Sequence, residues 1–190
     1  LMGYTEARAT PSATRFDALV AAANAAAAPA GQPYPFFLAH PLQAAPTTLG
    51  DPADWLVEWK YDGIRAQLVR RAGQTWIWSR GEELVTERFP EIVAAAQALP
   101  DGCVLDGEIL VWRDDAAAPS PFNLLQQRIG RKTLNKKVLA DAPVNFIAYD
   151  LLEWQGRDLR AQPQHERRRL LEQATGVAGM LLSPFEVRAT

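Results

Sequence analysis

The chain has 190 residues, which suits one domain with room for part of a second. Its composition, 48% hydrophobic and 22% charged, excludes a disordered or collagen-like chain, and the single cysteine excludes an intrachain disulfide framework and favours a reducing compartment. No run of about 20 apolar residues predicts a membrane span, and a formal net charge of −2 means that nucleic acid would have to be held by local basic patches.

The first 52 residues predict a helix and a connection. Alanine is the best helix former, so the Ala-rich residues 16–30 indicate a helix that ends near Pro29 and Gly31. We interpret residues 1–31 as the C-terminal remnant of a helical domain and residues 32–52 as a proline-stiffened linker. Since the first residue is Leu1, we expect the chain to begin at an internal cut.

From residue 53 to residue 190 the pattern predicts a second domain of short strands and helices. Alternation in residues 56–62 predicts a strand, and residues 64–71 predict its hairpin partner beyond Gly63. Further strands are expected at 75–79, 103–112, 144–154 and near 180–187, and helices at 88–99, 121–130 and 165–175. Because strands and helices do not alternate strictly, we predict an α+β fold with largely antiparallel sheets.

Lys60 is the first candidate for chemistry. It lies among apolar residues and is flanked by two carboxylates, Glu58 and Asp62. An edge-strand lysine in surface ion pairs and a nucleophile that has lost its proton are about equally compatible with this pattern. Arg65, just beyond the Asp62–Gly63 turn, supplies a cation that can hold a phosphate.

The segment EWKYDGIR, residues 58–65, resembles the signature of the covalent nucleotidyltransferases, which comprise ATP-dependent DNA ligases, RNA ligases and mRNA capping enzymes. In that signature the lysine takes a nucleotide monophosphate onto its side-chain nitrogen. Three further segments resemble the family's later motifs in order and spacing: WSRGEELVTERFPEI (78–92), VLDGEILVW (104–112) and FIAYDLLEWQGRDLR (146–160). The resemblance covers residues 55–185 and implies the family's adenylation domain.

The resemblance also implies roles for individual residues. Lys60 would be the nucleophile toward ATP, and Tyr149 would stack on the purine. Carboxylates of the Asp-Gly-Glu strand would grip ribose hydroxyls or Mg²⁺, with Glu108 as the metal ligand. The remaining candidates for nucleotide contact are Glu58, near the adenine, Asp62 and Gly63 of the lysine motif, Arg65, Arg80, directed at ribose or DNA phosphate, and Asp106.

Within this superfamily the chain resembles bacterial stand-alone ATP-dependent DNA ligases. NAD-dependent ligases generally carry an apolar residue at the position of Arg65, and the 78–92 segment is more similar to DNA ligases than to capping enzymes. The resemblance implies a monomeric, cytoplasmic enzyme that seals nicked duplex DNA with ATP and Mg²⁺. Since the family's later Glu-Gly and Lys-x-Lys motifs are not in this sequence, we expect a nucleotide pocket that lacks some of its groups.

Two other interpretations remain open. The chain is also compatible with an RNA ligase or a capping guanylyltransferase, and with a non-catalytic fragment that only binds nucleotide or DNA. Basic residues form two tracts in an otherwise neutral chain, and they are either solvated faces or contacts to DNA phosphates. These residues are Arg128, Arg131, Lys132, Lys136 and Lys137 in one tract and Arg167, Arg168 and Arg169 in the other.

Overall fold

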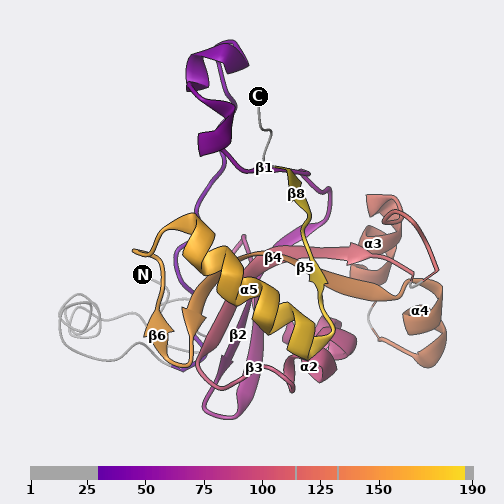
Figure 1. Ribbon diagram of the computed structural model, residues 1–190. Coiled ribbons are helices and arrows are strands. Elements are labelled where there is room, and N and C mark those ends of the chain that lie inside the picture. Colours follow the sequence, from indigo (N-terminus) through magenta and orange to yellow (C-terminus); the bar gives the residue numbers. More distant parts are fainter. Residues whose placement is uncertain (1–29, 114, 132, 187–190) are drawn as a thin grey trace, which may run out of the picture.

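The structure, a computed structural model, describes residues 30–113, 115–131 and 133–186. The helix expected at residues 16–30 therefore lies almost wholly outside the described residues. The described part is built on one curved sheet with helices packed against it, and it confirms the α+β prediction (Figure 1).

The main sheet contains six strands, paired in the order β3-β2-β4-β5-β6, with β7 beside β5. All neighbours are antiparallel except β5 and β7, which are parallel. The expected strands at 75–79, 103–112 and 144–154 are confirmed to within about a residue. The strands are β2 (Ile64–Arg71), β3 (Gln74–Ser79), β4 (Cys103–Val111), β5 (Val144–Trp154), β6 (Arg157–Asp158) and β7 (Leu181–Leu182).

The hairpin expected between residues 56–62 and 64–71 is wrong. Strand β2 pairs with β3 along one edge and with β4 along the other, so neither edge is free for the preceding segment. Only β1 (Val57–Glu58) is a strand there, and it pairs with β8 (Phe185–Glu186) in a separate two-stranded sheet. Lys60 consequently lies in an irregular connection that joins the two sheets.

Helices lie mostly where the sequence predicts them. The three expected helices correspond to α2 (Pro90–Ala96), α3 (Phe122–Ile129) and α5 (Gln164–Ala178). A fourth, α4 (Lys136–Asp141), was not predicted; Asn135 caps its N-terminus, with a side chain that accepts a hydrogen bond from Val138 N. The 3₁₀ turns are η2 (Pro46–Leu49), η3 (Pro52–Asp54) and η4 (Thr86–Arg88), and η2 and η3 project from the body of the fold (Figure 1).

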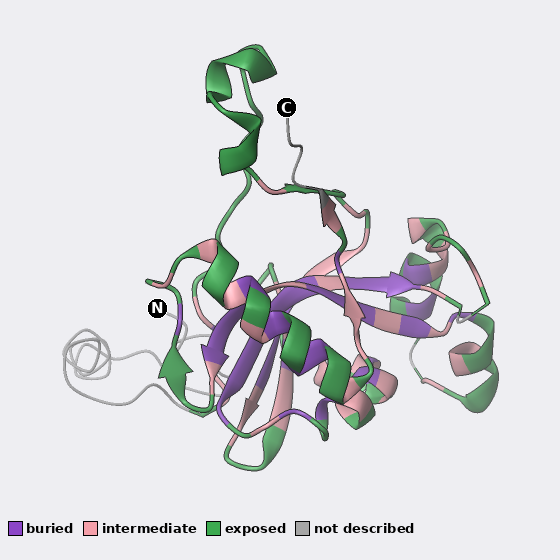
Figure 2. Cartoon of the chain, viewed as in Figure 1, coloured by how far each residue is buried: buried purple, intermediate pink, exposed green. Residues whose placement is uncertain are grey.

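The two faces of the main sheet have different neighbours. Side chains alternate along a strand, so Ala66 and Leu68 of β2 face a large core that includes residues of α2, α3 and α5. On the opposite face a small apolar cluster around Val69 packs against Tyr34, Trp76 and Trp78. Figure 2 shows the buried residues gathered in the central strands and the inner side of α5. None of the described helices has the length and apolar character to cross a bilayer.

Candidate active site

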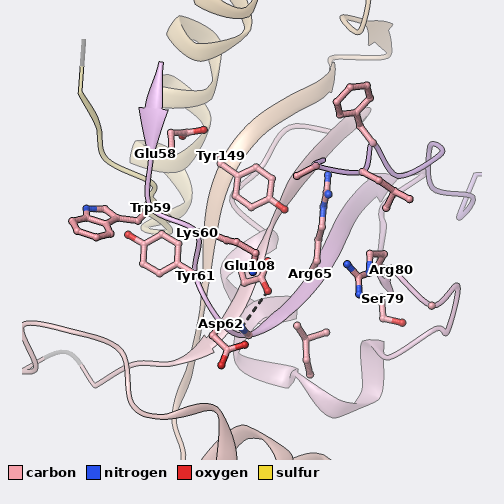
Figure 3. A pocket seen from close by; sticks show the side chains of 16 residues that line it. Glu58, Trp59, Lys60, Tyr61, Asp62, Arg65, Ser79, Arg80, Glu108 and Tyr149 are labelled. Carbon is pink, nitrogen blue, oxygen red and sulfur yellow. Dashed lines mark hydrogen bonds between the residues drawn. The ribbon is translucent and has the colours of Figure 1, made fainter. Parts of the chain in front are cut away.

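The motif residues come together around an open pocket of about 780 Å³ (Figure 3). Residues 58–65 form one side of the pocket. The rest of the lining comes from residues 37–39, from residues 79–81 at the end of β3 and just after it, and from Glu108 of β4 and Tyr149 of β5. All but one of the candidate site residues line it, namely Glu58, Lys60, Asp62, Gly63, Arg65, Arg80, Glu108 and Tyr149. The exception, Asp106, contacts the pocket through its hydrogen bonds to Arg65 and Tyr149.

Lys60 is exposed in the connection between β1 and β2. The backbone of this connection is fixed at Gly63, whose N–H donates to Glu108 Oε1 at 3.2 Å. A Cβ at Gly63 would lie 2.3 Å from the Ile109 carbonyl oxygen, so only glycine allows the connection to approach β4 this closely. Lys60 is therefore presented to the pocket from a backbone that is held against the sheet.

Glu108 lies beside Lys60 in the pocket (Figure 3). Burial raises the pKa of Glu108 to about 7, while the Gly63 N–H and the charge of Lys60 act in the opposite direction. A carboxylate with such a pKa changes its charge near neutral pH, which suits a group that exchanges protons or binds a cation.

Arg65 and Asp106 form a fork-to-fork ion pair on neighbouring strands. Arg65 Nη2 donates to Asp106 Oδ2 at 2.9 Å, and its Nε donates to Oδ1 at 3.3 Å. Burial raises the pKa of Asp106, and the Arg65 guanidinium opposes that shift. The Tyr149 ring lies 5.7 Å from the guanidinium carbon of Arg65, and its hydroxyl donates to Asp106 Oδ1 at 3.4 Å. Asp106 thus holds the Arg65 guanidinium and contacts the Tyr149 hydroxyl, and it does not itself line the pocket.

Tyr149 occupies a β-bulge. Asp106 pairs with Asp150 and Gly107 pairs with Ala148, so Tyr149 is the extra residue between two ladder positions. A Cβ at Gly107 would lie 2.4 Å from the carbonyl oxygen of Ile147, so glycine permits the close backbone approach beside the bulge. The bulge re-aims the tyrosine ring toward the pocket, a use of bulges that is common near functional sites.

Two adjacent arginines of α5 form ion pairs with Glu58, which lines the pocket, and with Asp150, which is next to Tyr149. Arg168 donates to Glu58 Oε1 at 3.4 Å and to the Ser183 carbonyl at 2.6 Å. Arg167 donates to both oxygens of Asp150, at 2.8 and 3.0 Å, directly beside Tyr149. Glu58 is thereby bound to the helix. Burial raises the pKa of Glu58, and the nearby charge of Arg168 opposes that shift only in part.

Part of each basic tract is buried in ion pairs, so these arginines are not the solvated faces that were one of the two interpretations of the tracts. Arg168 has a side chain only 7% exposed, Arg167 has one 15% exposed, and Arg128 has one 1% exposed and is paired with Glu91. Burial of an arginine requires such partners. In contrast, Arg131, Lys136, Lys137 and Arg169 are exposed, as expected for solvated faces. Lys132 lies outside the described residues.

The pocket fits a nucleotide better than it fits a metal alone. It offers an aromatic ring from Tyr149 and three cations, Lys60, Arg65 and Arg80, with room for a base, a sugar and phosphates. Among the described residues, no three Asp, Glu, His or Cys side chains are grouped to hold a metal. Mg²⁺ bound to nucleotides usually takes one or two carboxylates together with phosphate oxygens, and Glu108 fits the carboxylate position.

Comparison with known proteins places these features in a family. The model described as "ATP dependent DNA ligase domain" matches residues 36–182. A probable DNA ligase of Opitutus terrae is 48% identical over 119 residues, which are 62% of this chain and 11% of that protein. DNA ligase C of Mycobacterium tuberculosis is 41% identical over 130 residues, which are 67% of this chain and 36% of that protein.

Solved structures agree with the sequence comparison. The ligase domain from M. tuberculosis LigD has a TM-score of 0.53 and 30% identity, over 67% of this chain and 38% of that one. A mycobacterial DNA ligase D complexed with ATP and MES has a TM-score of 0.53 and 32% identity, over 68% and 39% of the two chains. The chain spans only 11% and 36% of the two curated relatives named above. The fold, the motif order and the matched residues together show that the chain belongs to the family of ATP-dependent DNA ligase domains.

Proposed function

We propose that this chain is the adenylation unit of an ATP-dependent DNA ligase, and that Lys60 is its nucleophile. The observation that carries the proposal is the position of Lys60, exposed at a pocket that also presents Tyr149, Arg65 and Glu108. The relatives named as DNA ligases, and the neighbour complexed with ATP, support this choice of substrate.

The reaction begins when Lys60 Nζ, in its neutral form, attacks the α-phosphorus of ATP. A nitrogen–phosphorus bond forms, the bond to the β-phosphate oxygen breaks, and pyrophosphate leaves. AMP then passes from Lys60 to the 5′-phosphate at a nick, and the adjacent 3′-hydroxyl displaces AMP to join the strand. In this scheme Tyr149 binds the adenine, while Arg65 and Arg80 stabilise negative charge on ribose and phosphate oxygens.

Mg²⁺ would contribute charge that the pocket does not have. Three cations and three carboxylates line it, the latter being Glu58, Asp62 and Glu108, so the described lining is formally neutral. A triphosphate needs compensating positive charge for its leaving pyrophosphate. We propose that Glu108 binds Mg²⁺ together with phosphate oxygens; when bound, the ion supplies Lewis-acid stabilisation of those oxygens.

The test of this proposal is covalent labelling. Protein incubated with ATP labelled at the α-phosphate and Mg²⁺ should acquire an acid-labile label, and Lys60→Ala should acquire none. Lys136→Ala, which removes an exposed lysine of α4 remote from the pocket lining, is the matched control and should label normally. Labelling that persists in Lys60→Ala would overturn the assignment, and labelling by GTP in place of ATP would favour a capping enzyme.

The experiment is best run on residues 1–190 and on the longest natural form that carries them. With only three cations in the described lining, one of them paired with Asp106, we expect residues 1–190 alone to bind ATP but to label slowly.

We further propose that the substrate is nicked duplex DNA, that the protein acts as a monomer and that it works in a bacterial cytoplasm. Nick sealing by the longer form, measured on a singly nicked duplex, distinguishes the ligase from a non-catalytic binding fragment.

A further inference from the structure

Residues 30–39, which we call the strap, lie on the same face of the main sheet as the pocket. The strap is anchored to two strands through its backbone: Trp78 Nε1 donates to the Gly31 carbonyl at 2.7 Å, and Tyr34 N donates to Gln67 Oε1 at 2.8 Å. The Tyr34 hydroxyl also donates to Glu153 Oε2 at 2.7 Å. These contacts join the strap to β3, β2 and β5.

The anchor of the strap is tightly packed. A Cβ at Gly31 would lie 2.7 Å from the Trp76 ring, so the backbone approaches the indole as closely as glycine allows. Arg71 donates to Glu153 at 2.6 Å and to the Gln32 carbonyl at 2.8 Å, which links the strap to an ion pair between β2 and β5. The strap therefore covers this part of the sheet as an integral layer.

Beyond the anchor, the strap reaches Arg65. The Phe36 ring lies 5.8 Å from the guanidinium carbon of Arg65, within the range of a cation–π contact. Phe36 does not line the pocket, whereas the next residues, Phe37, Leu38 and Ala39, do. Phe36 therefore does not contact the pocket itself, but its ring contacts Arg65, which does.

We propose that the strap is part of the nucleotide site and that Phe36 is a positioning residue that holds the Arg65 guanidinium in place for the nucleotide. This inference rests on the proposed function. Asp106 fixes two donors of the guanidinium, and the rings of Phe36 and Tyr149 restrict its remaining freedom. A guanidinium that is ordered before the ligand arrives loses less conformational entropy on binding.

A double-mutant cycle tests the proposal, with ATP and AMP binding to residues 1–190 measured by calorimetry. Phe36→Leu keeps an apolar side chain but removes the aromatic face, and it should weaken binding about 3- to 10-fold. Phe36→Tyr keeps the face and should bind like the unsubstituted chain. Leu42→Ala, at an exposed residue beyond the strap and outside the pocket lining, is the control and should change nothing.

The decisive arm is Arg65→Ala. If Phe36 acts through Arg65, then Phe36→Leu should cause no further loss of affinity in the Arg65→Ala background. A full additional loss there, or an unchanged affinity of Phe36→Leu alone, would overturn the positioning role and leave the proposed function intact. Absence of ATP and AMP binding by the unsubstituted chain would instead overturn the proposed function and this inference with it. Thermal unfolding of every variant confirms that folded protein is compared.

Discussion

Tyr149 shows how a single extra residue in a strand can define a binding surface. Its ring reaches the pocket because it lies in the bulge between the Asp106–Asp150 and Gly107–Ala148 pairs. The motif in the sequence identified the residue, but the bulge follows from pairing with a strand some 40 positions earlier, which alternation alone does not specify. Burial and the nearby charge of Asp106 raise the pKa of the Tyr149 phenol, so the ring stays neutral.

Substitution of Tyr149 separates its ring from its hydroxyl. Tyr149→Phe should leave ATP affinity and labelling of Lys60 nearly unchanged, because the hydrogen bond to Asp106 is long, at 3.4 Å. Tyr149→Ala should weaken binding by about 1–3 kcal/mol, the value typical of stacking on a base. Calorimetry and labelling rates measure both effects, and equal losses in the two variants would assign the role to the hydroxyl.

At the scale of elements, a buried arginine joins three helices. Arg128 of α3 donates to both oxygens of Glu91 on α2, at 2.6 and 2.7 Å. It also donates to the Arg88 carbonyl before α2 and to the Ala142 carbonyl after α4. A single guanidinium therefore satisfies groups at the ends of several short elements.

Removal of Arg128 should be strongly destabilising. Arg128→Met leaves Glu91 and two carbonyls without their donor, and the free energy of unfolding should fall by about 3–5 kcal/mol. Glu91→Gln should also be destabilising, because it leaves the Arg128 guanidinium, only 1% exposed, without its countercharge, although Gln keeps one oxygen as an acceptor. Urea unfolding measures both, and Arg131→Ala, at an exposed residue, is the control. A loss below about 1 kcal/mol for Arg128→Met would contradict this account.

Elements could be predicted from the sequence where local pattern decides them. The long strands β4 and β5 and the helices α2, α3 and α5 follow hydrophobic periodicity and were located well. The hairpin predicted around Lys60 is wrong because alternation does not specify which strands pair. Both edges of β2 are paired, one with β3 and the other with β4. The burial of Arg168 could also have been predicted, because helical spacing places it on the same face of α5 as the buried residues Leu171 and Thr175.

For the whole molecule, Glu108 makes stability depend on pH. Its pKa is about 7 in the folded chain against 4.5 ordinarily, so between these values the folded chain retains a proton that the unfolded chain has released. The retained proton stabilises the folded chain, and this stabilisation is fully present below pH 4.5 and is lost as pH rises through about 7. The cost arises because the charged carboxylate is partly buried in the pocket.

Glu108→Gln should remove that dependence. The variant should match the unsubstituted chain near pH 4 and exceed its stability at pH 8 by roughly 1–2 kcal/mol, after allowance for solvent screening. Gln retains the oxygen that accepts from Gly63. Denaturant unfolding across this pH range measures the difference, and Glu87→Gln, at an exposed residue of η4, should follow the unsubstituted profile. A Glu108→Gln variant that is less stable at pH 8 would contradict the prediction.

The strap also sets the order in which the molecule can be assembled. The Tyr34 hydroxyl bonds to a carboxylate 119 positions later in the chain, and the Tyr34 ring lies against Arg160, later still. During synthesis from the N-terminus, the strap emerges long before β5 and β6 exist. Contacts between residues so far apart in the sequence form late, and they make folding slower. The side of the pocket that the strap forms is therefore synthesised first but reaches its folded contacts only after residues up to Arg160 have been made.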